Sequence, residues 1–206
     1  MLKWSYQTEL LEAGCDEAGR GCLAGPVVAA AVILNPENPI EGLDDSKKIT
    51  ETKRELLRPE VEAKALAWAV GLVTNEEIDQ INILKGSFMA MHRALDQLKP
   101  KAKFIIVDGN RFIPYKRVLH QCIVKGDGKY QNIAAASILA KTHRDEIMRK
   151  LHDQYPHFGW ERNKGYPTKQ HRMALREHGA TEWHRMSFRL LQPELELTWP
   201  SKISKT

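Results

Sequence analysis

Short apolar runs, bounded by turn-forming residues, recur along the chain and predict buried β-strands. Residues 27–34, rich in Val, Ala and Ile between two proline-containing turns, form the clearest run. Residues 13–16 precede it and are expected to pair with it as a first strand, and residues 66–73 have the composition of a third. Two shorter runs follow, each closed by a segment that contains glycine: residues 104–107 and 118–124.

Three other segments are predicted to form helices. Apolar residues four, three, four and three positions apart predict a helix whose apolar face belongs to the core: Leu84, Phe88, Met91, Leu95 and Leu98. Pro100 ends that helix. Residues 130–153 contain neither Gly nor Pro and predict a long helix, and residues 169–178 predict another that ends at Gly179. Strands come first and then alternate with helices, so the predicted fold class is α/β with a mixed sheet.

The net charge of +5 is concentrated in one part of the 206-residue chain. Residues 141–189 carry 11 Lys/Arg against 6 Asp/Glu, a net of +5, whereas residues 1–140 carry 18 of each. We therefore expect one domain over residues 1–206, with a sheet core at about 10–140 and a basic helical part at about 141–190. The basic part is a candidate for binding phosphates, although a solvated helical surface gives the same composition.

Several classes of protein are disfavoured by composition. The first 20 residues carry four acidic residues, which is unlike a signal peptide, and the longest nearly apolar run, residues 22–34, is too short to span a bilayer. We therefore expect a cytoplasmic protein with no membrane contact. The three cysteines form no CxxC pair, so a disulfide framework or a structural zinc site is not expected: Cys15, Cys22 and Cys122.

Four carboxylates stand at predicted strand ends beside glycine: Asp16, Glu17, Asp108 and Asp127. Ligands of open α/β sheets gather at strand ends, so these acids could converge in one place. Their mutual repulsion would be relieved by bound cations, and oxygen ligands favour Mg²⁺ or Mn²⁺ over zinc. Two such ions can activate a water and stabilise a leaving oxygen, which suits cleavage of a phosphodiester without a side-chain nucleophile.

Each acid also has a plainer interpretation. Asp-Gly is a common turn pair, so Asp108 and Asp127 could be turn residues. Asp16 and Glu17 are neighbours, and neighbours on a regular strand point to opposite faces. We therefore expect the chain to bulge or leave the strand there, which Gly19 would permit.

Eight motifs, in order from about residue 10 to residue 190, resemble those of the ribonuclease HII family. Each motif alone is weak, and their combination in this order is specific. They are Asp16-Glu17-Ala18-Gly19-Arg20-Gly21 with Ala24-Gly25-Pro26, Asp45-Ser46-Lys47-Lys48, Ile81-Asn82-Ile83, Val107-Asp108-Gly109-Asn110, Lys125-Gly126-Asp127, residues 134–141 with Arg144-Asp145, residues 164–169, and residues 184–188.

The resemblance implies an RNase H-like fold with a central mixed five-stranded sheet, flanked by helices and followed by a helical C-terminal region. It implies an endonuclease that cuts the RNA strand of RNA–DNA hybrids and also cuts 5′ of single ribonucleotides embedded in duplex DNA. The expected chemistry is two-metal-ion hydrolysis with Mg²⁺ or Mn²⁺, which leaves a 3′-hydroxyl and a 5′-phosphate. The implied catalytic and metal-binding residues are Asp16, Glu17, Asp108 and Asp127. Asp145, a fifth acid on a helix, is interpreted as structural or as an ion-pair partner.

The resemblance also implies residues that contact the substrate. The loop Gly19-Arg20-Gly21 is expected to read the ribose 2′-hydroxyl, the group that distinguishes RNA from DNA locally. Tyr166 is expected to pack on the sugar near the RNA–DNA junction. The expected phosphate contacts are Lys47, Lys48, Lys164, Lys169 and Arg185.

Two other functions remain as alternatives. A DNA nuclease such as a junction resolvase would use the same type of fold, but the Gly-Arg-Gly loop and Tyr166 disfavour it. A nucleic-acid-binding module without catalysis is disfavoured by the presence of all four acids. We expect a monomer, and the tail after Leu190 is the expected place for any contact with a sliding clamp.

Overall fold

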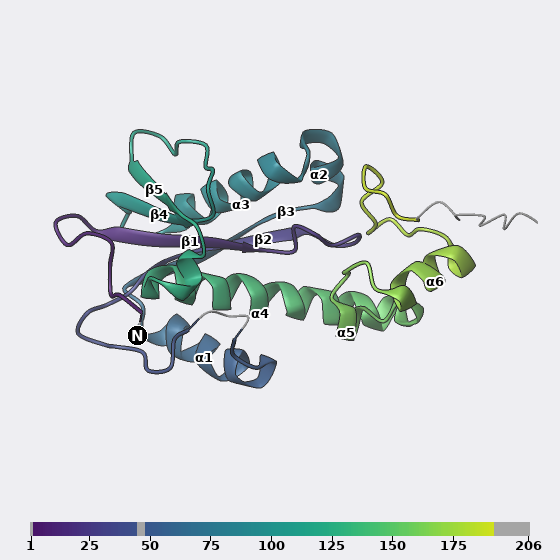
Figure 1. The fold of residues 1–206 in the computed structure, drawn as a ribbon, viewed down its shortest axis with the longest axis horizontal. Coiled ribbons are helices and arrows are strands. Elements are labelled where there is room, and N and C mark those ends of the chain that lie inside the picture. The colour runs from purple at the N-terminus through teal and green to yellow at the C-terminus, as the bar shows by residue number, and fades with distance from the viewer. Residues whose placement is uncertain (1, 45–47, 192–206) are drawn as a thin grey trace, which may run out of the picture.

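A mixed five-stranded sheet forms the centre of the computed structural model, which describes residues 2–44 and 48–191 (Figure 1). The strand order is β3-β2-β1-β4-β5. β1 pairs antiparallel with β2, and β2 pairs antiparallel with β3, whereas β1, β4 and β5 run parallel. The strands are β1 (Glu12–Ala18), β2 (Val27–Ile33), β3 (Ala67–Val73), β4 (Phe104–Asp108) and β5 (Leu119–Ile123).

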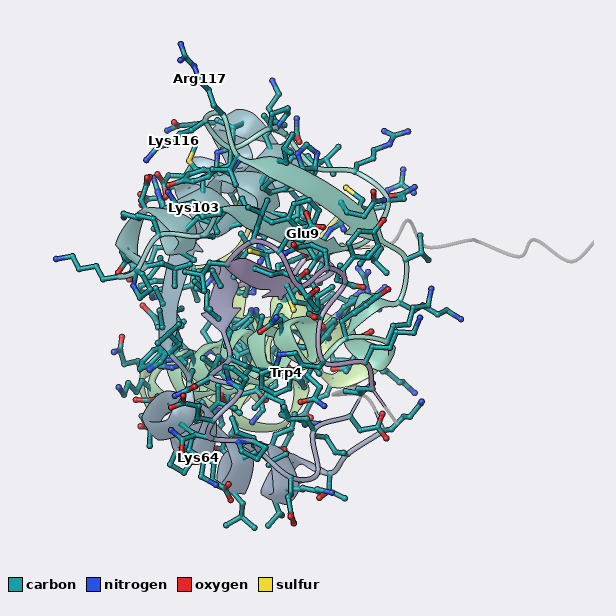
Figure 2. All side chains as sticks on the ribbon, turned by 90° about the vertical axis from the view of Figure 1, so that its left-hand side faces the viewer. Trp4, Glu9, Lys64, Lys103, Lys116 and Arg117 are labelled. Atoms are coloured by element: carbon teal, nitrogen blue, oxygen red, sulfur yellow. The ribbon has the colours of Figure 1, made fainter. Side chains whose placement is uncertain are left out.

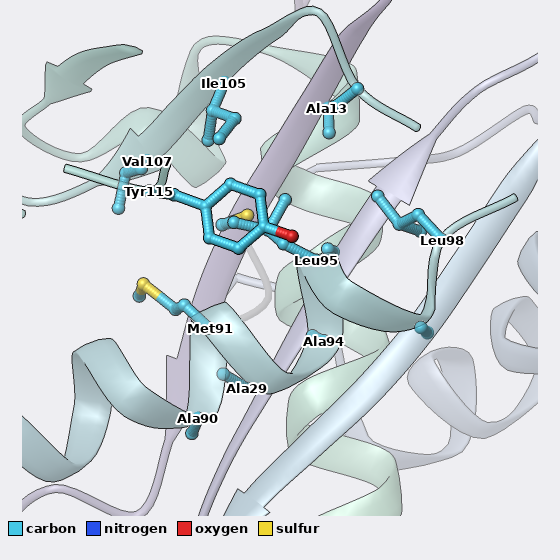
Figure 3. Close-up of a cluster of buried hydrophobic side chains, with 14 of the residues drawn as sticks. Ala13, Ala29, Ala90, Met91, Ala94, Leu95, Leu98, Ile105, Val107 and Tyr115 are labelled. Atoms are coloured by element: carbon cyan, nitrogen blue, oxygen red, sulfur yellow. The ribbon is translucent and has the colours of Figure 1, made fainter. Parts of the chain in front are cut away.

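Helices cover both faces of this sheet. α3 (Ile83–Gln97) packs on one face, and Figure 3 shows its Met91 and Leu95 in the core they share with Val107 of β4. α4 (Gln131–Gln154) packs on the other face, and α1 (Glu51–Lys64) lies along α4 (Figure 1). Apolar side chains are buried on both faces, which explains why β2 is apolar throughout instead of alternating.

Gly14 lets α4 approach the central strand closely. A Cβ atom at this position would lie 2.3 Å from the backbone carbonyl carbon of Asn132, near the beginning of α4. Such a contact is sterically forbidden, and main-chain atoms of a helix cannot turn aside as a flexible side chain can. The close approach fixes α4 against β1, and both elements continue toward the same end of the sheet.

The C-terminal part packs around the far end of α4 (Figure 1). Its short helices are η2 (Pro156–Phe158) and α5 (Trp160–Asn163), followed by α6 (Lys169–His178). Phe158 and Trp160 are fully buried, with their rings stacked at 5.0 Å between centroids. This cluster fixes the loop between α5 and α6, which carries Tyr166.

The opposite end of the molecule is shown in Figure 2. It carries the amino ends of parallel strands, since Glu9 precedes β1 and Lys103 precedes β4. The carboxyl ends of β1 and β4 therefore lie toward the C-terminal part. No helix among the described residues is long and apolar enough to cross a membrane.

The predicted strands and the three predicted helices are confirmed within a few residues. Three helices were not predicted as separate elements: α1, α2 and the four-residue α5. α1 buries only Arg54, Leu57 and Val61 in fourteen residues and contains Pro59, so its apolar stripe is faint in the sequence. α2 (Asn75–Ile81) is short, although its capping box of Thr74 and Glu77 is a recognisable start signal.

Candidate active site

A pocket of about 270 Å³ opens where β1 and β4 end. Four segments meet there: the end of β1 with the loop after it, the end of β4, the middle of α4, and the loop before α6. The lining residues are Asp16, Glu17, Ala18, Gly19, Arg20, Gly21, Asp108, Ser137, Lys141 and Tyr166. The predicted convergence of strand-end acids is therefore present for Asp16, Glu17 and Asp108.

Asp16 is the most enclosed of these acids. It is 6% exposed, lies on the α4 face of the sheet and has a hydrogen bond with Ser137. Burial raises the pKa of Asp16 well above its usual value, and the nearby charges of Glu17 and Asp108 raise it further. A cation placed beside Asp16 would offset both effects.

Glu17 begins on the opposite face of β1 from Asp16. Its side chain is 10% exposed, and its Oε1 lies 3.0 Å from Nη1 of Arg20. Burial raises the pKa of Glu17, while the guanidinium of Arg20 acts against that rise. The Arg20–Glu17 pair thus links the glycine loop, Gly19-Arg20-Gly21, to the end of β1.

The expected bulge between Asp16 and Glu17 is wrong. Both residues pair in regular antiparallel register, Asp16 with Ala30 and Glu17 with Ala29. On the other side, β4 pairs with β1 only as far as Cys15. Beyond that residue the sheet is open at one edge, so side chains from both faces of β1 reach the same pocket without a break in the strand.

Asp108 and Asp127 are joined through the backbone. The Gly126 N–H donates to Oδ1 of Asp108 at 2.6 Å, and Gly126 begins the single turn η1 (Gly126–Gly128). Asp127 is 1% exposed and accepts a hydrogen bond from the Gly128 N–H at 3.0 Å. Asp127 directly follows the residue whose N–H binds Asp108, but Asp127 is not among the lining residues of the pocket.

The donor set suits a hard divalent cation. Carboxylate oxygens are the ligands that Mg²⁺ and Mn²⁺ prefer, and two of the acids have pKa values raised by burial and by their neighbours. Within residues 2–44 and 48–191, no three His, Cys, Asp or Glu side chains are already arranged to hold a metal ion.

The glycine loop packs tightly on the protein beneath it. Gly19 has a φ of +94°, and an added Cβ there would lie 2.0 Å from Nε of Arg144. Gly21 faces the ring of Tyr166, since an added Cβ would be 3.8 Å from a ring carbon. Arg20 is half exposed between them, and Tyr166 is 42% exposed. The four residues form one wall of the pocket.

The expected phosphate contacts differ in accessibility. Lys169 is exposed at the beginning of α6, and Lys48 is exposed with Asp44 3.9 Å away. Lys47 lies outside the described residues. Lys164 is only 7% exposed, and its Nζ lies 3.2 Å from Oε1 of Glu51. Its ammonium is therefore already occupied within the fold.

The expectation that Arg185 contacts a phosphate is corrected by its burial. Arg185 is 0% exposed, and its guanidinium donates to the carbonyl oxygens of Gly25 and Arg20. A buried cation engaged by backbone carbonyls does not reach a duplex outside. The sequence could not reveal this, because these carbonyls lie about 160 positions away along the chain.

Three pocket residues were not predicted as site residues, and two of them, Ser137 and Lys141, have polar side chains. Ser137 and Lys141 are four positions apart on α4, so they share one face of the helix, and this spacing was visible in the sequence. Lys141 pairs with Asp145 at 3.6 Å. Asp145 is thus an ion-pair partner, as interpreted from the sequence, but it is buried rather than exposed.

Comparison with known proteins identifies the family. The family model described as ribonuclease HII matches residues 13–191. The chain belongs to the ribonuclease HII family. It is 62% identical to the ribonuclease HII of Phocaeicola vulgatus over 199 residues, which cover 96% of this chain and 99% of the relative. As a member of this family, it is a nuclease that hydrolyses the RNA strand of RNA–DNA hybrids.

Solved structures of the family share the fold. The ribonuclease H2 of Pyrococcus horikoshii is 30% identical, with a TM-score of 0.72 over 87% of this chain and 94% of that chain. The ribonuclease HII of Archaeoglobus fulgidus, solved as a complex with PCNA, is 29% identical, with a TM-score of 0.73 over 90% of this chain and 98% of that chain. The RNase H-like fold with a mixed five-stranded sheet, expected from the sequence, is confirmed.

Proposed function

We propose that this ribonuclease HII also cuts duplex DNA on the 5′ side of a single embedded ribonucleotide, leaving a 3′-hydroxyl and a 5′-phosphate. The observation that carries the proposal is the wall formed by Gly19, Arg20, Gly21 and Tyr166 beside the carboxylates. A site that only hydrolysed phosphodiesters would need the acids alone. Glycine backbone next to an aromatic ring suits close contact with one sugar and its 2′-hydroxyl.

The acids are the proposed holders of two Mg²⁺ or Mn²⁺ ions: Asp16, Glu17, Asp108 and Asp127. Such ions, when bound, lower the pKa of a water and stabilise charge on the leaving oxygen. The raised pKa values of Asp16 and Glu17 support this assignment, because a nearby cation would restore their ionised forms. Asp127 would join the other acids by adopting another side-chain rotamer, since the Gly126 hydrogen bond holds the turn η1 against Asp108.

The chain's own cations have separate tasks in this proposal. Lys141 lines the pocket beside the acids and is placed to attract the phosphate that is cut. Arg20 is half exposed and is placed for a neighbouring phosphate, with Lys48 and Lys169 contacting the backbone of the duplex farther out. Lys47 is part of the same proposal and lies outside the described residues. Tyr166 would pack on the sugar at the RNA–DNA junction.

The proposed partner protein is a sliding clamp. The relative from Archaeoglobus fulgidus was solved with PCNA. In this chain the tail after Leu190 is the proposed contact, and residues 192–206 lie outside the described residues. Gel filtration with light scattering, with and without the host's clamp, tests both this contact and the proposed monomeric state.

The experiment that tests the function uses two duplexes of one sequence, one all-DNA and one with a single ribonucleotide. Each is incubated with Mg²⁺, with Mn²⁺, or with chelator, and the products are mapped at nucleotide resolution. The expected result is one metal-dependent cut, 5′ of the ribonucleotide. Cleavage of both duplexes would instead favour a DNA nuclease. Binding of both without cleavage would favour a non-catalytic module.

A further inference from the structure

Two guanidinium groups are buried directly behind the glycine loop. Arg144 of α4 is 1% exposed and Arg185 is 0% exposed. Within the described residues, every hydrogen bond of these two guanidinium groups goes to a backbone carbonyl oxygen. Arg144 donates to Pro26 at 2.9 Å, Lys164 at 2.7 Å and Ala24 at 3.1 Å. Arg185 donates to Gly25 at 2.9 and 3.0 Å and to Arg20 at 3.0 Å.

Both groups carry charge in a place where charge is costly. Burial lowers the pKa of Arg185 to about 10, and the charge of Arg144 contributes to that fall. Arg185 is still protonated at neutral pH. A buried cation must be compensated by hydrogen bonds, and here five carbonyl dipoles supply the compensation. Those carbonyls belong to irregular segments, so the arginines order backbone that no strand or helix would hold.

Arg185 determines which way one peptide group of the loop faces. Its Nη1 holds the carbonyl of Arg20 toward the interior. In a trans peptide the C=O and the following N–H point in opposite directions, so the N–H of Gly21 points away from Arg185. Gly21 is exposed, lines the pocket and has Tyr166 as its neighbour. A backbone donor is thus presented beside the aromatic ring.

Arg144 connects the two sides of the same wall. It packs under Gly19, and it holds the carbonyl of Lys164, two positions before Tyr166. The Sγ of Cys22 also donates to the Lys164 carbonyl at 3.4 Å. The side chain of Arg144 therefore holds the glycine loop and the loop that carries Tyr166 (the tyrosine loop) in a fixed position relative to each other.

We propose that Arg185, supported by Arg144, is a positioning residue that sets selectivity for ribose by fixing the Arg20–Gly21 peptide opposite Tyr166. This inference rests on the proposed function, since it concerns how that pocket reads a 2′-hydroxyl. It gives the segment around residues 184–188 a task other than phosphate binding. That segment is itself anchored to α2, where Asp79 accepts hydrogen bonds from the backbone N–H groups of Met186 and Ser187 at 2.8 and 3.0 Å.

The test compares Arg185→Lys with wild type on two duplexes, one with a ribonucleotide and one with 2′-fluoro-2′-deoxyribose at the same position. Lysine keeps the charge but cannot reach both carbonyls with a planar fork. We expect kcat/KM on the ribonucleotide duplex to fall on the order of 10²-fold. The ratio of ribose to 2′-fluoro cleavage should fall as well, while the Kd for uncut duplex in the presence of Ca²⁺ changes less than about threefold, since phosphate contacts dominate duplex affinity.

Leu98→Ala is the matched control. Leu98 is 0% exposed at the end of α3, in the core cluster that also holds Ala13, and it belongs neither to the C-terminal cluster nor to the two loops. This variant should lose stability without changing the ribose selectivity ratio. A selectivity loss in Leu98→Ala equal to that in Arg185→Lys would show general loosening and would overturn the proposal.

An unchanged ratio and unchanged kcat in folded Arg185→Lys would also overturn it. If that variant does not fold, Phe188→Leu replaces it. The ring of Phe188 lies 5.2 Å from Cζ of Arg185, so this change leaves the guanidinium in place but loosens it. We expect the same loss of selectivity, smaller in size, and an unchanged ratio would refute the inference. Failure of wild type to cut the ribonucleotide duplex would instead refute the proposed function.

Discussion

Acidification should destabilise the protein through one buried histidine, His184. This residue is 1% exposed, and its Nδ1 accepts the N–H of Thr181 at 2.9 Å. Its Nε2 lies 3.1 Å from Nε2 of His171, which also accepts from Nε1 of Trp160. The neutral arrangement that fits these contacts has His184 donating from Nε2 and His171 donating from Nδ1 to the Tyr166 carbonyl. The lone pair of His171 Nε2 is then shared between His184 and Trp160. A second proton on either ring would break a hydrogen bond.

The size of the stability loss follows from the lowered pKa of His184. Burial, followed by the proximity of His171, lowers the pKa of His184 to about 4 from its ordinary value of 6.5. In the unfolded chain the imidazole is protonated near 6.5, so the unfolded state binds the proton first as the pH falls. The contribution is fully present above pH 6.5 and is lost progressively down to about pH 4. At about 1.4 kcal/mol per tenfold change in affinity, the loss is about 3 kcal/mol.

The assay is urea denaturation followed by tryptophan fluorescence between pH 7.5 and pH 4, for wild type and His184→Gln. The variant removes the titrating group, so only wild type loses this contribution as the pH falls. The free energy of unfolding of wild type minus that of the variant should therefore decrease by about 3 kcal/mol between pH 7.5 and pH 4. Leu98→Ala, which removes no titratable group and lies outside the cluster around His184, should keep a constant difference from wild type. A constant difference for His184→Gln as well would refute the reasoning.

Three further predictions concern the site and the sheet. Asp16→Asn and Asp108→Asn should abolish cleavage of the ribonucleotide duplex, with free energies of unfolding near wild type; unchanged turnover in either would remove that residue from the site. Gly14→Ala should cost about 3 kcal/mol in urea denaturation, because its methyl group meets the backbone of α4. Lys169→Ala should reduce the slope of log Kd for duplex against log salt by about 1, whereas Lys164→Ala should leave it unchanged, because Lys164 is buried against Glu51.

Much of the fold was predictable because the patterns are strong where the core is deep. β2 is apolar on both faces, and α3 has an apolar stripe with a helical period, so each could be read from local sequence. α1 escaped prediction because its contacts with the core come from three residues, one of which is the charged Arg54. Local sequence says little about a helix whose stability comes mainly from packing on α4.

The features of the site also differ in how far local sequence reveals them. The strand-end acids Asp16, Glu17 and Asp108 were predictable, since glycine and strand boundaries are local signals. The way Asp16 and Glu17 share a pocket was not, because it depends on where β4 stops pairing with β1. The burial of Arg185 and Lys164 could not be predicted either. The sequence does not distinguish a cation that contacts a phosphate from one that contacts a carbonyl of a distant segment.

The central position of β1 has a consequence for how such an enzyme can change over time. Asp16 and Glu17 belong to the strand with partners on both sides, whereas Tyr166 depends on the separate cluster around Trp160. Substitutions in that cluster can move the tyrosine loop while the acids stay where the sheet puts them. Under the proposed function, the contact with the sugar can therefore drift among descendants of one ancestor while the proposed metal-binding acids keep their places in the sheet.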